Sequence, residues 1–429
     1  RLYFIDNSEP CGNPKVDSAI NQICPPGSYE VATIKGNAVI GQSGGPTCVI
    51  NESLVGAVLE SAKHEEIGHM YGARHGLQGL LTNDLIDLTA ETPETLERVA
   101  RTPSAALGSV RMKATEEDCK KLIKIFKEHD IRYFFYIGGN DTAETANIVD
   151  ELARGEDYEF RVCHIPKTID NDLRETDHCP GYGSAARFVA LALMGDNLDN
   201  AALKGVKIDV IMGRHAGFLT GAAALARQSE TDGPHLIYLP EVAFEEDRFV
   251  DDVAGCLDRH GRCVIAVSEG ISRADGSPVL TSGEKDSHGN VQLSGTGALG
   301  DFLSNIVKEK VPAASRVRAD TLGYMQRCFP GIRSEIDAKE ARSAGAFAVR
   351  SMIEGELSSG TVCIRRKEVD GHYDSEMFIT DLNKVAKHTK EMPAEFISET
   401  GNDVTQAFMD YVRPLADDLP VIGRLGQGS

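Results

Sequence analysis

The residues with the clearest chemical potential lie in the segment Pro166–Asp172, which we call the acidic segment. It contains a lysine, a threonine hydroxyl and two carboxylates within seven positions. A carboxylate can accept the proton of an attacking hydroxyl group, and a lysine can neutralise the charge of a transferred anion. A glycine turn, Gly138–Asp141, precedes this segment in the chain. Together the two segments indicate a site for phosphoryl transfer.

The glycine turn lies between an expected strand and an expected helix. The run 132–137 is short, aromatic and β-branched, which is typical of a buried parallel strand, and the run 142–149 favours a helix. Glycines at such a junction let the backbone approach an anion, and the first N–H groups and dipole of the helix favour phosphate there. A plain turn is the alternative interpretation of a lone Gly-Gly pair.

The acidic segment follows a second expected strand, at 160–165. Its polar residues therefore emerge at the carboxyl end of a strand, where open α/β sheets bind ligands. One of its two carboxylates could act as a general base, and the other could orient that base or a metal ion.

The chain resembles the phosphofructokinase family in seven segments that occur in the family's order. They are 41–46 (GQSGGP), 107–111 (LGSVR), 138–141 (GGND), 168–172 (TIDND), 212–214 (MGR), 268–270 (SEG) and 322–327 (LGYMQR). Chance does not account for seven matches in register. The resemblance implies an α/β fold with two Rossmann-like, three-layer lobes, mostly parallel sheets and an active site in the cleft between the lobes.

Two residues are similar to the pyrophosphate-using branch of that family. Its ATP-using members have glycine at the positions of Asp141 and Lys167. By resemblance, Asp141 occupies the space that the α-phosphate and ribose of a nucleotide need, and Lys167 supplies a cation to pyrophosphate. An acidic side chain also repels a phosphate group, so the nucleotide is rejected by charge as well as by size.

The resemblance implies an enzyme that reversibly transfers a phosphoryl group from pyrophosphate to the C1 hydroxyl of fructose 6-phosphate, a step of glycolysis. Asp170 would be the general base, Thr168 would position the reacting groups, Asp172 would orient the site, and Lys167 would act on the donor. An ATP-dependent 6-phosphofructokinase and a non-catalytic regulatory subunit of the same fold are the alternatives.

The resemblance also assigns binding residues. The implied donor-binding residues are Gly44, Gly45, Arg111, Gly139, Asn140, Asp141 and Lys167. The implied sugar-phosphate residues are Thr168, Asp170, Met212, Gly213, Arg214, Glu269, Arg318, Tyr324 and Arg327. Because the family's pattern has Arg318 reach into a neighbouring subunit, we expect a homodimer or homotetramer.

The implied cofactor is Mg²⁺, with Asp141 and Asn140 as its protein ligands. Many relatives carry a second aspartate where this chain has Asn140, so one anionic ligand becomes a neutral amide. Hard cations prefer oxygen ligands and keep several waters, and we therefore expect Mg²⁺ to be held mainly by pyrophosphate, Asp141 and water.

Composition and charge agree with an ordinary globular enzyme. The formal net charge is −20 and the isoelectric point is about 5.1, which argues against nucleic acid or an anionic membrane as a partner. The ten cysteines include no Cys-x-x-Cys pair, and we expect reduced thiols in a cytoplasmic protein. No apolar run approaches the roughly 18 residues of a membrane span, and residues 1–35 lack the pattern of a signal peptide.

The alternation of strands and helices predicts two lobes. We expect an N-terminal arm at 1–35, a donor lobe at 36–181 plus about 326–380, a sugar-phosphate lobe at 182–325 and a tail region at 381–429. The polar stretch 272–294 is interpreted as a surface insertion. His215 is expected to begin the helix that follows the Met-Gly-Arg segment.

Overall fold

A computed structural model of the protein describes residues 34–112, 114–156, 158–280, 297–355, 357–386 and 388–425. Nearly all of the predicted N-terminal arm lies outside these residues, and so does the greater part of the predicted insertion at 272–294. None of the described helices is both long and apolar enough to cross a membrane.

The larger of two sheets has seven strands within the described residues. They are β1 (Gly36–Gln42), β2 (Ile67–Ala73), β3 (Leu85–Asp87), β4 (Ile131–Gly138), β5 (Arg161–Pro166), β10 (Ser359–Val369) and β11 (His372–Thr380). Their order is β11-β10-β5-β4-β1-β2-β3. The neighbours from β2 to β10 pair in parallel, and the edge strands β3 and β11 are antiparallel. Strands β4 and β5 are almost continuously buried, as expected for a parallel sheet covered on both faces.

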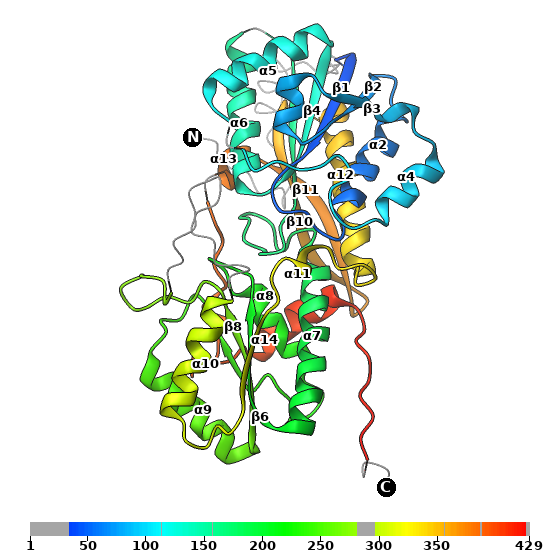
Figure 1. Ribbon diagram of the computed structural model, residues 1–429. Coiled ribbons are helices and arrows are strands. Elements are labelled where there is room, and N and C mark those ends of the chain that lie inside the picture. The colour runs from blue at the N-terminus through cyan, green and yellow to red at the C-terminus, as the bar shows by residue number, and fades with distance from the viewer. Residues whose placement is uncertain are drawn as a thin grey trace, which may run out of the picture. The chain divides into compact units, whose positions relative to one another are not determined.

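Helices cover both faces of this sheet (Figure 1). On one face lie α2 (Ile50–Ser61), α4 (Pro93–Ala100) and α12 (Glu335–Glu354), and on the other lie α3 (Leu77–Thr82), α5 (Glu116–Glu128) and α6 (Asn140–Gly155). Thr115 caps α5 with a capping box, and Leu122 and Phe126 of this helix are buried against the sheet, as its helical spacing predicts. The predicted three-layer α/β fold is confirmed.

Helices α2 and α12 approach each other closely at two glycines. A Cβ atom on Gly345 of α12 would lie 2.0 Å from the Ser53 carbonyl oxygen, and one on Gly56 of α2 would lie 2.1 Å from the Arg342 carbonyl oxygen. The contact therefore requires the absence of a side chain on both helices. It attaches α12, which lies far along the chain, to α2 on one face of the larger sheet.

The smaller sheet has four strands in the part of the chain that the structure describes. They are β6 (Gly205–Ile211), β7 (Leu236–Tyr238), β8 (Arg262–Ser268) and β9 (Val317–Thr321), in the order β7-β8-β6-β9 with all pairs parallel. The side chains that cover its two faces come from α7 (Tyr182–Leu203) with the 3₁₀ helix η2 (Ala222–Ala226), and from α9 (Glu246–His260) with α10 (Ala298–Lys310). This second α/β/α unit matches the predicted two-lobe architecture, while the predicted domain limits stay a prediction.

The shortest elements lie in the connections and near the C-terminus. They are η1 (Leu88–Ala90), α8 (Phe218–Gly221), α11 (Met325–Cys328), α13 (Leu382–Val385), η3 (Ala394–Phe396), α14 (Gln406–Val412) and η4 (Arg413–Ala416). The prediction that His215 begins a helix is wrong, because α8 begins at Phe218. His215 instead lies in the bend between β6 and α8, where it lines the cavity described below.

Candidate active site

One cavity of about 430 Å³ gathers nearly all of the predicted site residues. Those that line it are Gly44, Gly45, Arg111, Gly139, Asn140, Asp141, Lys167, Thr168, Asp170, Asp172, Met212, Arg214, Glu269, Tyr324 and Arg327. They follow strands of both sheets. Gly213 and Arg318 are not among the lining residues.

Strand pairing in the larger sheet brings the glycine turn beside the acidic segment. Gly138 at the end of β4 pairs with Pro166 at the end of β5, and Ile137 pairs with Gln42 at the end of β1. Because neighbouring parallel strands end at the same edge of a sheet, the three loops that follow them meet there. In the smaller sheet Ile211 pairs with Ser268, which places Met212 and Glu269 side by side in the same way.

A buried histidine forms a hydrogen bond with the first residue of the glycine turn. His164 Nε2 lies 2.9 Å from the Gly138 carbonyl oxygen, and His164 Nδ1 lies 2.6 Å from Thr361 Oγ1. Burial lowers the pKa of His164 to about 4, so the ring is neutral and its Nε2–H donates to Gly138. Helix α6 begins directly after Gly139, so the residues of its first turn line the cavity, where a helix N-terminus favours an anion.

Lys167 joins the acidic segment to the loop that follows β1. Its Nζ donates to the Gly45 carbonyl oxygen at 2.8 Å, and the residue is only 3% exposed. Burial lowers the pKa of Lys167 to about 7, and the positive charges of Arg327 and Arg111 lower it further. A bound anion would relieve this repulsion, so the charges themselves favour a phosphate ligand.

The two carboxylates of the acidic segment share a buried environment. Burial raises the pKa of Asp170, although Arg327 and Arg214 oppose the shift. Burial also raises the pKa of Asp172, to about 7, and the neighbouring charge of Asp170 adds to that effect. The backbone N–H of Asp170 donates to Thr168 Oγ1 at 3.1 Å. Raised pKa values bring carboxylates closer to neutral pH, where a general base must be able to accept a proton.

Arg327 extends from α11, which follows β9 of the smaller sheet, to the loop that follows β1 of the larger sheet. It lies at the end of α11, and a Cβ atom on Gly45 would be 3.0 Å from its Cζ. Its guanidinium group also lies 4.7 Å from the centroid of the Tyr324 ring. Arg327 therefore reaches residues of both the predicted donor site and the predicted sugar-phosphate site.

Several buried polar atoms in the cavity have no protein partner. Within the described ranges, Asn140 Oδ1, Asp170 Oδ1 and Arg214 Nε lack a hydrogen bond. Buried polar groups normally find partners, so these atoms indicate a bound ligand. The free oxygen of Asn140, next to the carboxylate of Asp141, offers the oxygen donors that suit Mg²⁺.

The two remaining predicted residues lie elsewhere. Gly213 has a φ of +126°. Its carbonyl oxygen accepts a hydrogen bond from Ser268 Oγ at 2.7 Å, which joins the segment after β6 to the end of β8. Arg318 is exposed on β9 and its Nη1 donates to the Val317 carbonyl oxygen at 2.9 Å. Its proposed role in a neighbouring subunit stays a prediction.

Some of the residues that line the cavity were not predicted from the sequence. Thr142 and Thr145 line the cavity from the first turns of α6, and the spacing of four residues between Asp141 and Thr145 could have revealed Thr145. Thr389 comes from the C-terminal region, and no motif in the sequence marks it.

The comparisons with known proteins agree with this geometry. Residues 37–352 match the family model described as phosphofructokinase. The chain belongs to the phosphofructokinase family. It is 54% identical over 385 residues to the pyrophosphate–fructose 6-phosphate 1-phosphotransferase of Rhodospirillum rubrum, covering 89% of this chain and 94% of that one.

Two further relatives are also named as pyrophosphate-dependent enzymes. The protein of the same name from Methylococcus capsulatus is 38% identical over 397 residues, covering 90% of this chain and 93% of that one. The crystal structure of the pyrophosphate-dependent phosphofructokinase from Marinobacter aquaeolei superposes with a TM-score of 0.80 at 34% identity, covering 91% of this chain and 94% of that one.

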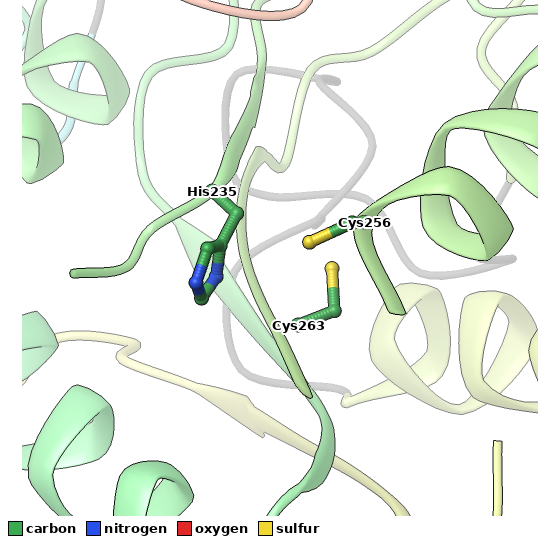
Figure 2. Close-up of side chains that lie close together, drawn as sticks. All are labelled: His235, Cys256 and Cys263. Carbon is green, nitrogen blue, oxygen red and sulfur yellow. The ribbon is translucent and has the colours of Figure 1, made fainter. Parts of the chain in front are cut away.

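A second cluster of reactive side chains lies away from this cavity, in the smaller sheet. Figure 2 shows the sulfur atoms of Cys256 and Cys263 next to each other, with the ring of His235 beside them. His235 Nδ1 accepts the Val264 N–H at 2.9 Å, so its lone pair is engaged and the proton of the neutral ring lies on Nε2. Burial and the charge of Arg262 lower the pKa of His235 to about 4.

The two thiols of this cluster differ in acidity, because a hydrogen bond with Cys263 lowers the pKa of Cys256. Burial raises the pKa of Cys263 well above its usual range, which keeps the thiol protonated, whereas metals bind the thiolate. Cys256 Sγ donates to the Arg262 carbonyl oxygen at 3.4 Å. We therefore interpret the cluster as packing within the second lobe. The eight cysteines in the described residues are free thiols.

Proposed function

We propose that the protein reversibly transfers a phosphoryl group from pyrophosphate to the C1 hydroxyl of fructose 6-phosphate, giving fructose 1,6-bisphosphate and phosphate. The observation that carries this proposal is the position of Lys167, a buried ammonium group bonded to the loop of Gly45. Burial lowers its pKa to about 7, and the positive charges of Arg327 and Arg111 lower it further, so an anion bound at the donor side would stabilise three neighbouring cationic groups at once. Such a site suits a small, highly charged anion.

The preference for pyrophosphate over ATP is argued from two side chains. Asp141 and Lys167 both line the cavity where ATP-using members of the family have glycine. Each adds bulk and a charge at the donor end, and the carboxylate of Asp141 repels a nucleotide phosphate placed beside it. The names of the relatives from R. rubrum and M. capsulatus support the same donor.

The proposed reaction begins with Asp170. Its carboxylate accepts the proton of the C1 hydroxyl as that oxygen forms a bond to one phosphorus of pyrophosphate. The bond from that phosphorus to the bridging oxygen breaks, and phosphate leaves with the electron pair. Lys167 stays bound to the oxygens of the leaving group, where charge builds up during transfer. Asp172 would orient the site beside Asp170.

The sugar phosphate would be bound from the second lobe. Arg214 suits phosphate or sugar oxygens, Glu269 suits sugar hydroxyls, and Arg327 with Tyr324 would hold the 6-phosphate. Arginine is well matched to such a dianion because its planar guanidinium group donates two parallel hydrogen bonds.

The proposed cofactor is Mg²⁺. Asn140 and Asp141 would hold it, since they offer a buried free amide oxygen and a carboxylate at one end of the cavity. When bound, Mg²⁺ neutralises charge on the pyrophosphate oxygens.

A donor-exchange assay tests the proposal. Purified protein is supplied with fructose 6-phosphate, Mg²⁺ and either pyrophosphate or ATP, and the formation of fructose 1,6-bisphosphate is measured. We expect turnover with pyrophosphate and little with ATP. A clear preference for ATP would overturn the donor assignment, and inactivity with both donors would favour a non-catalytic subunit.

A further inference from the structure

The C-terminal region passes directly beside the acidic segment. The backbone N–H of Lys390 donates to the Asp172 carbonyl oxygen at 2.7 Å, and Thr389 forms a β-bridge with Leu173. The Lys390 ammonium group donates to the carbonyl oxygens of Thr176 and Asp177 at 3.0 and 3.1 Å. These bonds fix the backbone on the C-terminal side of the two carboxylates.

The same region is anchored on both lobes. Val385 and Ala386 pack with Ala143 of α6 in the first lobe. Phe408 and Val412 of α14 are buried in the core of the second lobe, with α7 and α8. The chain between these anchors crosses from one lobe to the other at the level of Lys390. The acidic segment thus lies against a connection that both lobes hold.

The side chain of Tyr411 completes this support. Asn171 Nδ2 donates to Tyr411 Oη at 2.6 Å, and Tyr411 Oη donates to the Asp177 carbonyl oxygen at 2.8 Å. The Asn171 Oδ1 accepts the Cys179 N–H at 2.9 Å. Asn171 is fully buried, so these bonds replace any contact with water.

Asn171 lies between the two carboxylates of the acidic segment and has an unusual backbone conformation. Its φ of +60° is left-handed, a conformation that few non-glycine residues adopt and that asparagine tolerates better than most. Asp170 and Asp172 on either side line the cavity, whereas Asn171 does not. The orientation of both carboxylates therefore depends on the hydrogen bonds of Asn171.

The ring of Tyr411 is itself fixed. Its centroid lies 5.2 Å from that of Phe396 and 5.9 Å from that of Phe218, and the Arg366 guanidinium group lies 4.6 Å from the ring centroid. A ring held by such packing holds its hydroxyl group at a fixed point. Burial raises the pKa of Tyr411, so the hydroxyl stays protonated and can donate to Asp177.

We propose that Tyr411 is a positioning residue for the transfer reaction: through Asn171 it fixes the backbone that carries the proposed base Asp170 and its neighbour Asp172. This inference rests on the proposed function. Tyr411 is not among the residues that line the cavity, so removal of its hydroxyl group should slow the chemical step and leave substrate binding nearly unchanged.

The first test replaces Tyr411 with phenylalanine, which keeps the ring and removes the hydroxyl group. We expect kcat to fall on the order of tenfold to a hundredfold, because small misplacements of a catalytic group have effects of this size. The KM values for pyrophosphate and fructose 6-phosphate should change less than about twofold, since ground-state binding is retained.

Tyr158→Phe is the matched control. Tyr158 Oη also donates to backbone carbonyl oxygens, those of Phe126 and Ile131, and an arginine, Arg132, lies 4.5 Å from its ring centroid. It lies in the first lobe, on the face of the larger sheet that α5 and α6 cover. A comparable loss of melting temperature in both variants, with a loss of kcat only in Tyr411→Phe, would support the inference.

A second variant tests the path through Asn171. Asn171→Gly keeps the left-handed backbone accessible and removes the side-chain bonds, and it should reduce kcat by a similar factor. In the double variant, Tyr411→Phe should add little to the effect of Asn171→Gly, because both changes remove the same interaction. If Tyr411→Phe does not fold, the kcat of Asn171→Gly alone tests the inference.

Two outcomes would overturn the inference while leaving the proposed function intact. These are wild-type kcat in folded Tyr411→Phe, whether or not its melting temperature falls, and fully additive effects in the double variant. Wild-type protein that is inactive with pyrophosphate would instead reject the proposed function.

Discussion

The Nζ atom of Lys167 lies 2.8 Å from the carbonyl oxygen of Gly45. This bond joins the loop after β5 to the loop after β1, across the intervening strand β4. It places an ammonium group in the floor of the cavity, where a glycine at position 167 would leave open space. Gly44 beside it has a φ of +74°, and a Cβ atom there would lie 3.2 Å from Lys167 Nζ. The loop and the lysine therefore fit each other.

Donor selection should change when the two charged side chains are removed together. In a paired Asp141→Gly, Lys167→Gly variant, we expect turnover with pyrophosphate to fall on the order of a hundredfold or more, because a donor-side cation is lost. Turnover with ATP should rise above that of the wild type, because the bulk and the repelling carboxylate are gone. Steady-state assays with each donor measure both changes. A variant that loses pyrophosphate turnover and gains none with ATP would contradict the steric and electrostatic explanation.

The pH dependence of kcat/KM should be bell-shaped with a maximum near neutral pH. As pH falls through about 7, Asp172 takes up a proton, and because burial also raises the pKa of Asp170, the base is lost at a higher pH than for an exposed aspartate. As pH rises through about 7, free Lys167 loses its proton and binds pyrophosphate less well. In the kcat profile the alkaline limb should move to higher pH, since bound pyrophosphate raises the pKa of Lys167.

Asp172→Asn provides the control for that profile. Removing one of two like charges lowers the pKa of the other, so the acid limb should move to lower pH. A flat kcat/KM profile of the wild type between about pH 6 and pH 8 would refute the assignment of these groups.

Loss of the proposed base should abolish most of the turnover without unfolding the protein. For Asp170→Ala, we expect kcat to fall by about 10² to 10⁴. The melting temperature should be unchanged or higher, because the buried carboxylate has a raised pKa and an unpartnered oxygen among the described atoms. Asp247→Ala, at a highly exposed position, is the control. Near-normal activity of Asp170→Ala would exclude Asp170 as the base.

Stability should respond strongly to a side chain at the contact between α2 and α12. Gly345→Ala places a Cβ atom 2.0 Å from the Ser53 carbonyl oxygen, so the helices must separate. We expect the free energy of unfolding to fall by about 1–3 kcal/mol. In Gly195→Ala the new Cβ atom of α7 meets no atom within 4 Å, and the same substitution should stabilise by about 0.5–1 kcal/mol. Urea denaturation measures both, and equal effects would show that the close approach is not the cause.

The acidic segment illustrates how much of the site could be predicted from the sequence. Its composition indicated chemistry, its position after an apolar strand indicated the edge of a sheet, and the neighbouring glycine turn indicated an anion. These are local properties, because strand, turn and helix depend on residues close together in the chain. The structure confirms that Lys167, Thr168, Asp170 and Asp172 line one cavity with the glycine turn.

The C-terminal region shows what could not be predicted from the sequence. Its sequence has little periodicity and its helices are short, so neither Thr389 nor Tyr411 carried a signal. Their importance comes from contacts with residues more than 200 positions earlier, such as the bond between Tyr411 and Asn171. A pattern of hydrophobic residues does not encode a pairing of this kind.

The sequence by itself predicted the two lobes and the sheet edge that carries the acidic segment, and its resemblance to the phosphofructokinase family assigned most of the side chains that line the cavity. Tertiary structure alone decided how the acidic segment is supported and how far its pKa values move. Those properties arise from burial and from long-range hydrogen bonds, and they exist only once distant parts of the chain have packed together.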